Sequence, residues 1–216
     1  MGLATILAVL AICFAGSAQA DTFRNCTTAE EQTLHQSLDR AKELTLKAAA
    51  SVGDTRDYAR WFGPYSEVNA ERVRARMKAI VAAIRRGGVT ASCEQVEPDG
   101  CATGEYAYVY SNRPYHMYIC PQFFDLPSLE ALRPGSRRSD FGTREGTIVH
   151  EISHFETVAG TEDHCYSRSE CSLMAWQDPD LAIENADSFQ YFTEDVTYFA
   201  RQPIGDKPPP ASAGGR

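Results

Sequence analysis

The chain has 216 residues, a formal net charge of −8 and hydrophobic residues at 43% of its positions. This acidic balance argues against nucleic acid or an anionic membrane surface as the main partner, because both attract basic proteins. The length suffices for one domain with a buried core. No stretch after the first twenty residues approaches the length of a transmembrane helix.

The first twenty residues predict a cleaved secretory signal. Residues 3–15 form an apolar run without a charged residue, and the small residues that follow end in Ala18-Gln19-Ala20, a pattern that signal peptidases cut. The run is too short to span a bilayer comfortably. We therefore expect a signal peptide over residues 1–20, a single domain over residues 21–204 and a disordered tail over residues 205–216. The protein would be secreted, into a periplasm or outside the cell.

Cysteine usage agrees with export. One of the seven cysteines lies in the expected signal, and an even number remains in the mature chain. In an oxidising compartment six cysteines predict three disulfides, with fifteen pairings open. A cysteine-rich metal cluster is the alternative, although the sequence contains no CxxC pair. The six residues are Cys26, Cys93, Cys101, Cys120, Cys165 and Cys171.

The first half of the mature chain predicts helices. Apolar residues recur there at helical spacing, a threonine pair can cap the first helix, and glycines follow each segment. We interpret these apolar faces as core packing of a helical region. The expected helices extend from about Thr28 to Gly53, from about Asp57 to Gly63, and from about Val68 to Arg86.

The next part of the chain predicts a small antiparallel sheet. Residues 91–96 favour a strand, and the β-rich runs 106–110 and 115–120 flank turn residues as in a hairpin. The hairpin also offers an edge strand on which an extended peptide can pair. Helical patterns return from Arg144 to about Thr157 and again over residues 181–199. The fold class is therefore α+β: mostly helical, with a small antiparallel sheet and disulfide braces.

His150-Glu151-Ile152-Ser153-His154 is an HExxH sequence. On a helix its two histidines share a face, so both imidazoles can bind one ion, while Glu151 can act as base for a water molecule. The alternative is a helix with two surface histidines and an incidental glutamate. A catalytic zinc ion needs three protein ligands and an open position. Asp163, nine residues after His154 and beyond the break at Gly160-Thr161, can complete such a site. Glu184 and Glu194 are alternative third ligands that nothing in the sequence marks.

The extended motif HExxH followed by GTxDxxY resembles the aspzincins, the group of deuterolysin and peptidyl-Lys metalloendopeptidase. The resemblance is strong over roughly residues 118–198. It implies a zincin-like metalloprotease domain with one zinc ion bound by His150, His154 and Asp163. It also implies that Glu151 is the general base and later the proton donor to the leaving amine. Tyr166 would donate a hydrogen bond to the developing oxyanion, with simple packing as its alternative role.

The resemblance further implies disulfides between Cys26 and Cys93 and between Cys101 and Cys120. Cys165 and Cys171 then remain, and we expect a short third disulfide that braces the loop carrying Tyr166. Lysine-specific members of the family bind the substrate's ammonium group with acidic residues after the zinc site.

Asn185-Ala186-Asp187 matches that segment, which makes Asp187 a candidate floor of the pocket for the residue after the cut. Where the lysine-specific pattern has glutamate, this chain has Gln190, which should blunt the discrimination. Asp187 as an ordinary surface charge of a helix is the alternative.

Together these observations predict a secreted zinc metalloendopeptidase that acts on proteins or peptides and favours lysine after the cut. We expect a monomer, with its active site between the HExxH helix and the helical segment downstream, and without nucleic-acid or membrane partners once the signal is removed. One alternative is a secreted, disulfide-rich binding module with an inactive zinc site. Another is a zinc amidase that acts on cell-wall peptides.

Overall fold

The computed structural model describes residues 19–97, 100–132, 140 and 142–199. Almost all of the expected signal peptide and the whole expected tail lie outside the described residues, so both stay predictions. Within the described part, no helix is both long enough and apolar enough to cross a membrane.

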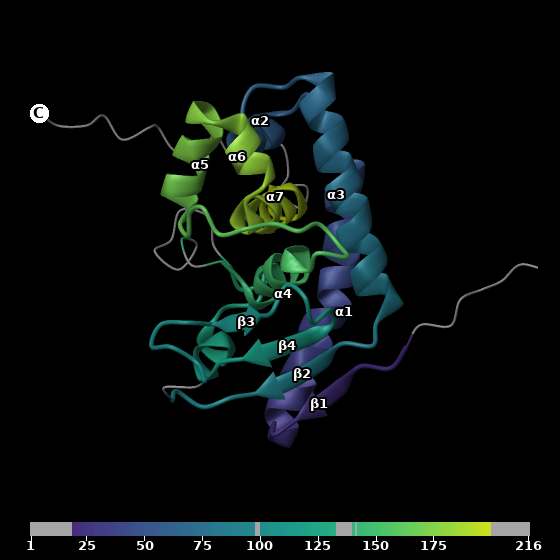
Figure 1. Cartoon of the computed structure of the whole chain (residues 1–216), viewed down its shortest axis with the longest axis vertical. Helices are drawn as coiled ribbons and strands as arrows, with labels where there is room; N and C mark the ends of the chain where they lie inside the picture. The colour runs from purple at the N-terminus through teal and green to yellow at the C-terminus, as the bar shows by residue number, and fades with distance from the viewer. Residues whose placement is uncertain (1–18, 98–99, 133–139, 141, 200–216) are drawn as a thin grey trace, which may run out of the picture.

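The three expected N-terminal helices are confirmed. They are α1 (Thr28–Ala50), α2 (Arg56–Phe62) and α3 (Glu67–Arg86). A capping box begins α1: the Thr27 hydroxyl accepts a hydrogen bond from the Glu30 backbone, and the Glu30 carboxylate accepts one from the Thr27 backbone at 2.7 Å. Figure 1 shows α1 and α3 side by side along one edge of the molecule.

The sheet has four short strands in the order β1-β2-β4-β3, and β3 forms one edge. The hairpin pair β3–β4 is antiparallel as expected, but β1–β2 and β2–β4 are parallel, so an antiparallel sheet was the wrong expectation for those pairs. Parallel neighbours need a crossover connection, and α1 to α3 provide it between β1 and β2. The strands are β1 (Thr22–Arg24), β2 (Thr90–Cys93), β3 (Ala107–Val109) and β4 (His116–Ile119).

The second half of the chain is helical. Two features differ from the expectation: α5 had no counterpart, and the expected last helix is two helices, α6 and α7, separated at Glu184 and Asn185. The HExxH helix α4 ends at His154 rather than near Thr157, because the extended backbone of Phe155 (ψ 127°) leads the chain out of the helix. The elements are η1 (Pro121–Asp125), α4 (Arg144–His154), α5 (Arg168–Gln177), α6 (Pro179–Ile183) and α7 (Ala186–Phe199).

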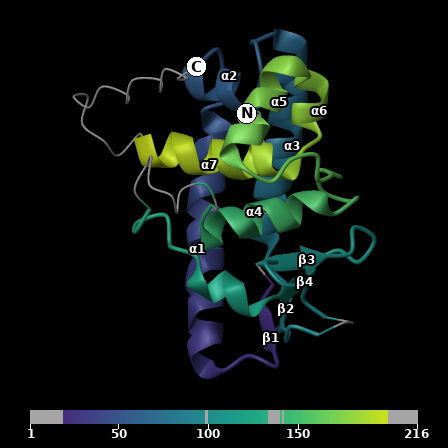
Figure 2. The same ribbon diagram turned by 90° about the vertical axis from the view of Figure 1, so that its left-hand side faces the viewer.

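Helix α4 lies at the centre of the molecule. Figures 1 and 2 show it between the sheet and α7, while α2, α5 and α6 lie beyond α7 and α1 runs past both central helices. Aromatic side chains fill the layer between α2 and α7, where Phe62 contacts Phe189 and Phe192. This arrangement makes α7 the inner support of α4.

All three expected disulfides are present. They join Cys26 to Cys93, Cys101 to Cys120, and Cys165 to Cys171. The first ties the segment before α1 to the end of β2, and the second ties the loop before β3 to the end of β4. The third closes a short loop around Tyr166 and connects it to α5.

Candidate metal centre

Two histidines of α4 and one aspartate of the following loop converge on a single point. The Nε2 atoms of His150 and His154 are 3.0 Å apart. The Oδ1 atom of Asp163 lies 3.3 Å from the first of these nitrogens and 3.4 Å from the second. One donor atom from each residue lies within 4.8 Å of the others. The structure therefore brings together the three side chains that the sequence named as candidate ligands.

The outer ring nitrogens fix the tautomers of both histidines. Nδ1 of His154 lies 2.8 Å from the backbone oxygen of Thr161, which can only accept, so this nitrogen carries the proton. Nδ1 of His150 lies 2.8 Å from Oδ1 of Asp187 and donates to it in the same way. Both Nε2 lone pairs therefore point at the shared centre. Such outer hydrogen bonds are usual for metal-binding histidines.

A tight turn brings Asp163 back to α4. Gly160 adopts a left-handed conformation (φ 56°), and the next backbone N–H, of Thr161, donates to the Ser153 carbonyl at 3.1 Å. The hydroxyl groups of Ser153 and Thr161 also hydrogen-bond at 2.6 Å. The break that the sequence indicated at Gly160-Thr161 is thus a turn that reverses the chain against the HExxH helix.

A second contact holds the loop from the other side. The side-chain oxygen of Asn185, at the joint between α6 and α7, accepts hydrogen bonds from the backbones of His164 (2.8 Å) and Cys165 (3.3 Å). The backbone of Glu162 pairs with that of Glu184 at 2.8 Å. Asp163 therefore sits between two anchored neighbours. The sequence had shown Asn185 only as part of a motif.

The two alternative third ligands are engaged elsewhere. Glu194 is fully buried and pairs with Arg168 and the start of α4, while Glu184 lies near Arg72 and Arg76 on the surface. Neither joins the group of donor atoms around the two histidines. Asp163 is therefore the carboxylate that accompanies the histidines in the structure.

Glu151 and Tyr166 both line the cleft in which these donors lie. Glu151 is 5% exposed, and burial raises the pKa of its carboxyl above the ordinary value. A base with a raised pKa is better matched to proton transfer near neutral pH. Tyr166 is 68% exposed, and partial burial followed by the charge of Asp163 raises the pKa of its phenol. The phenol therefore stays protonated and can donate a hydrogen bond.

Asp187 lines the cleft, and its assignment to the floor of the substrate pocket stays a prediction. It is 5% exposed, and one of its oxygens accepts the hydrogen bond from His150. The nearby Gln190 is also buried and donates to Glu194 at 3.4 Å. Both residues line the cleft, and each also makes one of these hydrogen bonds to a neighbouring side chain. Asp187 is not a surface charge, and its nearest role is to orient His150.

The cleft has a volume of about 990 Å³. It is lined by α4 with the loop that follows it, by α7, and by residues 104–112, which include the edge strand β3. Among the described residues that line it, five are carboxylate residues and none is lysine or arginine. An extended chain that adds to the edge of a sheet can satisfy its backbone hydrogen bonds there. The cleft can therefore hold a peptide beside the three donors.

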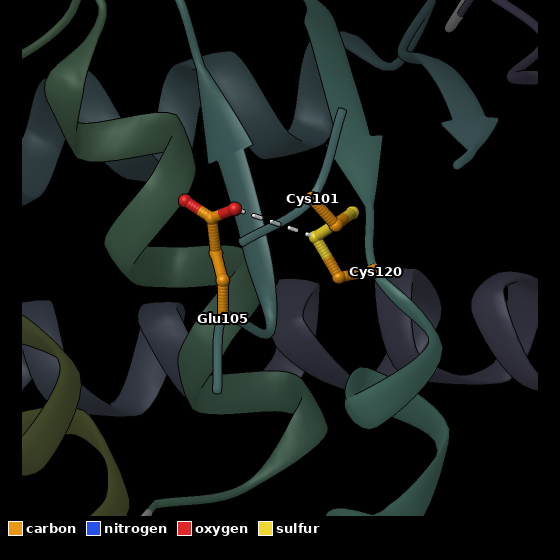
Figure 3. A group of neighbouring side chains, drawn as sticks. All are labelled: Cys101, Glu105 and Cys120. Carbon is orange, nitrogen blue, oxygen red and sulfur yellow. Dashed lines mark hydrogen bonds between the residues drawn. A yellow bond between two sulfur atoms is a disulfide. The ribbon is translucent and has the colours of Figure 1, made fainter. Parts of the chain in front are cut away.

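A second group of metal-ligating side chains, Cys101, Glu105 and Cys120, lies near the other wall (Figure 3). Its two sulfur atoms form a disulfide and so provide no thiolate for a metal ion. The dashed contact in Figure 3 joins Glu105 to a sulfur atom at 3.7 Å. Glu105 also accepts a hydrogen bond from the Ala102 backbone at 2.8 Å. This group stabilises the loop before β3 and is not a metal site.

The donor set at the first group fits zinc. Two neutral imidazole nitrogens and one carboxylate oxygen are ordinary zinc ligands, and three protein ligands leave a fourth position open in catalytic sites. The open side faces the cleft, where the side chain of Glu151 lies close to the donors. The chemistry of these donors and their tautomers therefore suits a catalytic rather than a closed structural ion.

Comparisons with known proteins point the same way. A family model described as lysine-specific metallo-endopeptidase matches residues 47–194. The chain is 30% identical over 184 residues to an extracellular protease of Aeromonas hydrophila, covering 83% of this chain and 49% of that protein. It is 27% identical over 177 residues to a peptidyl-Lys metalloendopeptidase of Armillaria mellea, covering 80% and 46%. The chain thus spans about half the length of these relatives.

A solved structure, the zinc peptidase from Grifola frondosa, has a similar fold. Its TM-score is 0.67 at 27% identity, and the match covers 80% of this chain and 98% of that one. The match of the family model over more than half of the sequence, together with this shared fold, identifies the relationship. The chain belongs to the aspzincin family.

Proposed function

We propose that the protein is a zinc-dependent endopeptidase. The observation that carries the proposal is the convergence of His150, His154 and Asp163 in a cleft that also contains the buried carboxylate of Glu151. A structural zinc site has no need of such a carboxylate, whereas hydrolysis of an amide needs a base beside the attacking water. Membership of the aspzincin family supports the same reaction.

The zinc ion would be held by Nε2 of His150, Nε2 of His154 and the carboxylate of Asp163. When bound there, it would polarise the scissile carbonyl group and acidify a water molecule. The hydrogen bonds to Thr161 and Asp187 keep both imidazoles in the tautomer that this role requires. The chain thus provides the ligands already oriented.

The remaining groups would transfer the proton, stabilise the developing charge and align the substrate. The Glu151 carboxylate would take a proton from the attacking water and pass it to the nitrogen of the leaving amine. The Tyr166 hydroxyl would donate a hydrogen bond to the carbonyl oxygen as negative charge develops on it. The backbone of β3 would align the substrate in an extended conformation along the cleft.

The substrates would be proteins or peptides, cleaved by a monomeric protein outside the cytoplasm. Three disulfides and the extracellular relative from Aeromonas hydrophila support export. A preference for lysine after the cut is supported by the peptidyl-Lys relatives and by the carboxylates that line the cleft. Because Asp187 is engaged with His150 and Gln190 is uncharged, we expect this preference to be partial.

The test is cleavage of an unfolded protein by the purified protein, expressed from its full chain, with cut sites mapped by mass spectrometry. We expect cuts that disappear on chelation and return with zinc. Glu151→Gln should retain zinc but lose about two to four orders of magnitude in rate. Glu71→Gln, at an exposed position of α3, is the matched control and should be as active as the unchanged protein.

Two outcomes would overturn the proposal. Zinc binding without any cleavage would favour the binding module. Cleavage confined to cell-wall peptides would favour the amidase. Cuts distributed without regard to lysine would leave an endopeptidase but remove the proposed preference.

A further inference from the structure

A partly buried arginine, Arg168, whose side chain is 14% exposed, lies directly after the loop that carries Asp163 and Tyr166. Arg168 donates to Glu194 at 2.5 Å and to Asp195 at 2.6 Å, both on α7. Its guanidinium group also lies 5.4 Å from the ring centre of Trp61 and 4.6 Å from that of Tyr191. A planar group that donates to two carboxylates and has aromatic rings beside it has little freedom to move. Arg168 therefore fixes the start of α5 to α7.

The same glutamate also contacts the beginning of the HExxH helix. Oε1 of Glu194 accepts hydrogen bonds from the backbone of Thr143 at 2.8 Å and from its hydroxyl at 2.9 Å. Thr143 caps α4, since its hydroxyl accepts from the Gly146 backbone at 3.0 Å. Arg168, Glu194 and Thr143 thus form a buried chain of contacts between the Tyr166 loop and the helix that bears His150.

Tyr166 depends on its backbone for its position. Its side chain is 68% exposed, so little packing holds the ring itself. Its carbonyl oxygen accepts a hydrogen bond from the Tyr191 hydroxyl at 3.2 Å, and the neighbouring Cys165 is bonded to Cys171. Arg168 follows two residues later and stacks on Tyr191. Every one of these anchors leads to α5 or α7.

We propose that Arg168 is a positioning residue: through Glu194 and Tyr191 it fixes the loop that carries Tyr166 relative to α4. The effect on catalysis rests on the proposed endopeptidase function, but the effect on the loop does not. A misplacement of a catalytic donor by about 1 Å can cost up to a hundredfold in rate. Arg168 touches none of the candidate ligands, so its loss should act on Tyr166 and not on zinc binding.

The kinetic test is a double-mutant cycle with Arg168→Met and Tyr166→Phe. We expect R168M to lower kcat about tenfold or more with little change in KM and with one zinc ion retained per chain. In the Y166F background the same change should cost less than about twofold, because the donor that it displaces is already absent. An equal loss of rate in both backgrounds would overturn the proposal.

A second variant covers the case in which R168M does not fold. Arg168→Lys keeps the positive charge that Glu194 and Asp195 require but cannot donate to both in one plane. It should lower kcat in the unchanged background and not in the Y166F background. Arg74→Met is the matched control. Arg74 lies on α3, where it donates to Glu67 and Tyr65, so this change should alter neither kcat nor KM.

Hydrogen exchange provides a readout that needs no activity. In the zinc-free protein, R168M or R168K should increase amide exchange in residues 161–171 while leaving exchange in α3 unchanged. Faster exchange in a protein that cleaves nothing would retain the positioning role and reject the endopeptidase. Unchanged exchange across residues 161–171 in a folded variant would reject the positioning role, whatever the activity.

Discussion

Nδ1 of His150 lies 2.8 Å from Oδ1 of Asp187, across the contact between α4 and α7. This hydrogen bond connects a candidate zinc ligand to a residue that the sequence placed in the substrate pocket. Asp187 is 5% exposed and accepts this hydrogen bond. Its negative charge therefore stabilises the orientation of the His150 imidazole. The bond both fixes the tautomer and raises the basicity of the other ring nitrogen.

Asp187→Asn should therefore weaken zinc binding about tenfold to a hundredfold, because it removes the charge behind His150. Competition with a chelator of known affinity measures the change. Asp180→Asn, which alters an exposed carboxylate on α6, is the control and should bind zinc normally. Unchanged zinc affinity together with a lost preference for lysine would return Asp187 to the pocket floor.

The disulfides should separate stability from activity. The Cys26–Cys93 bond closes a loop with a sequence separation of 67, and the Cys165–Cys171 bond one of 6. From loop entropy alone, replacing the first pair by serine should lower the free energy of unfolding by about 4 kcal/mol, and the second by about 2 kcal/mol. Urea unfolding measures both.

The smaller stability loss should accompany the larger loss of activity, because the short loop carries Tyr166. We expect the Cys165→Ser, Cys171→Ser double variant to lower kcat more than the Cys26→Ser, Cys93→Ser double variant does. Equal rates in the two proteins would contradict a role for the short disulfide in holding Tyr166.

Gly146 in the first turn of α4 should not tolerate a side chain. A Cβ atom there would lie 2.1 Å from Oε1 of Glu194. Alanine favours a helix over glycine by about 1 kcal/mol, but the clash should reverse the sign, so that G146A lowers the free energy of unfolding by about 1–3 kcal/mol. G53A is the control, because a Cβ at Gly53 meets nothing within 4 Å. Equal unfolding midpoints for the two variants would contradict this close approach.

Glu145, the residue before Gly146, should make the free energy of unfolding depend on pH. Burial raises the pKa of this carboxyl, and its oxygen accepts from the Leu129 backbone at 3.0 Å. Since the folded pKa exceeds the unfolded one, the stability that the protonated group contributes is present below the unfolded pKa of about 4.3 and is lost as pH rises through the folded pKa.

Glu145→Gln keeps the acceptor and removes the charge. The variant should have the same free energy of unfolding as the unchanged protein near pH 4 and a larger one near pH 7. Unfolding in urea at both pH values measures the difference. A constant difference between the two proteins across this range would show that Glu145 titrates normally.

Local signals explain which elements were predictable. The cap at Thr27 and the glycines after α2 and α3 mark helix ends within a few residues, and the three N-terminal helices follow them. Helix α5 has a cap at Ser167, but no apolar face marks it, because Leu173 and Trp176 on it are exposed and only two of its residues are buried. Its place depends on packing against α2 and on the Cys165–Cys171 bond, which local periodicity does not reveal.

The candidate site also contains residues that the sequence could predict and residues that it could not. His150, His154 and Asp163 lie within one helix and one turn, so their spacing along the chain was informative. The supports come from further away: Asp187 is 37 residues from His150, and Glu194 is 51 residues from Thr143. Hydrogen bonds between such distant residues depend on how α7 packs behind α4. For that reason the sequence could name Asp187 as a candidate for the substrate pocket but could not reveal its hydrogen bond to His150.

The position of α7 in the chain has a consequence for biosynthesis. Asp187, Tyr191 and Glu194 follow one another along α7 and reach His150, the Tyr166 loop and the cap of α4. During synthesis, His150, His154 and Asp163 therefore emerge before the helix that orients them. A nascent chain carries the ligands without their support, so we expect the ligand geometry to be complete only once residues up to Glu194 have emerged and folded.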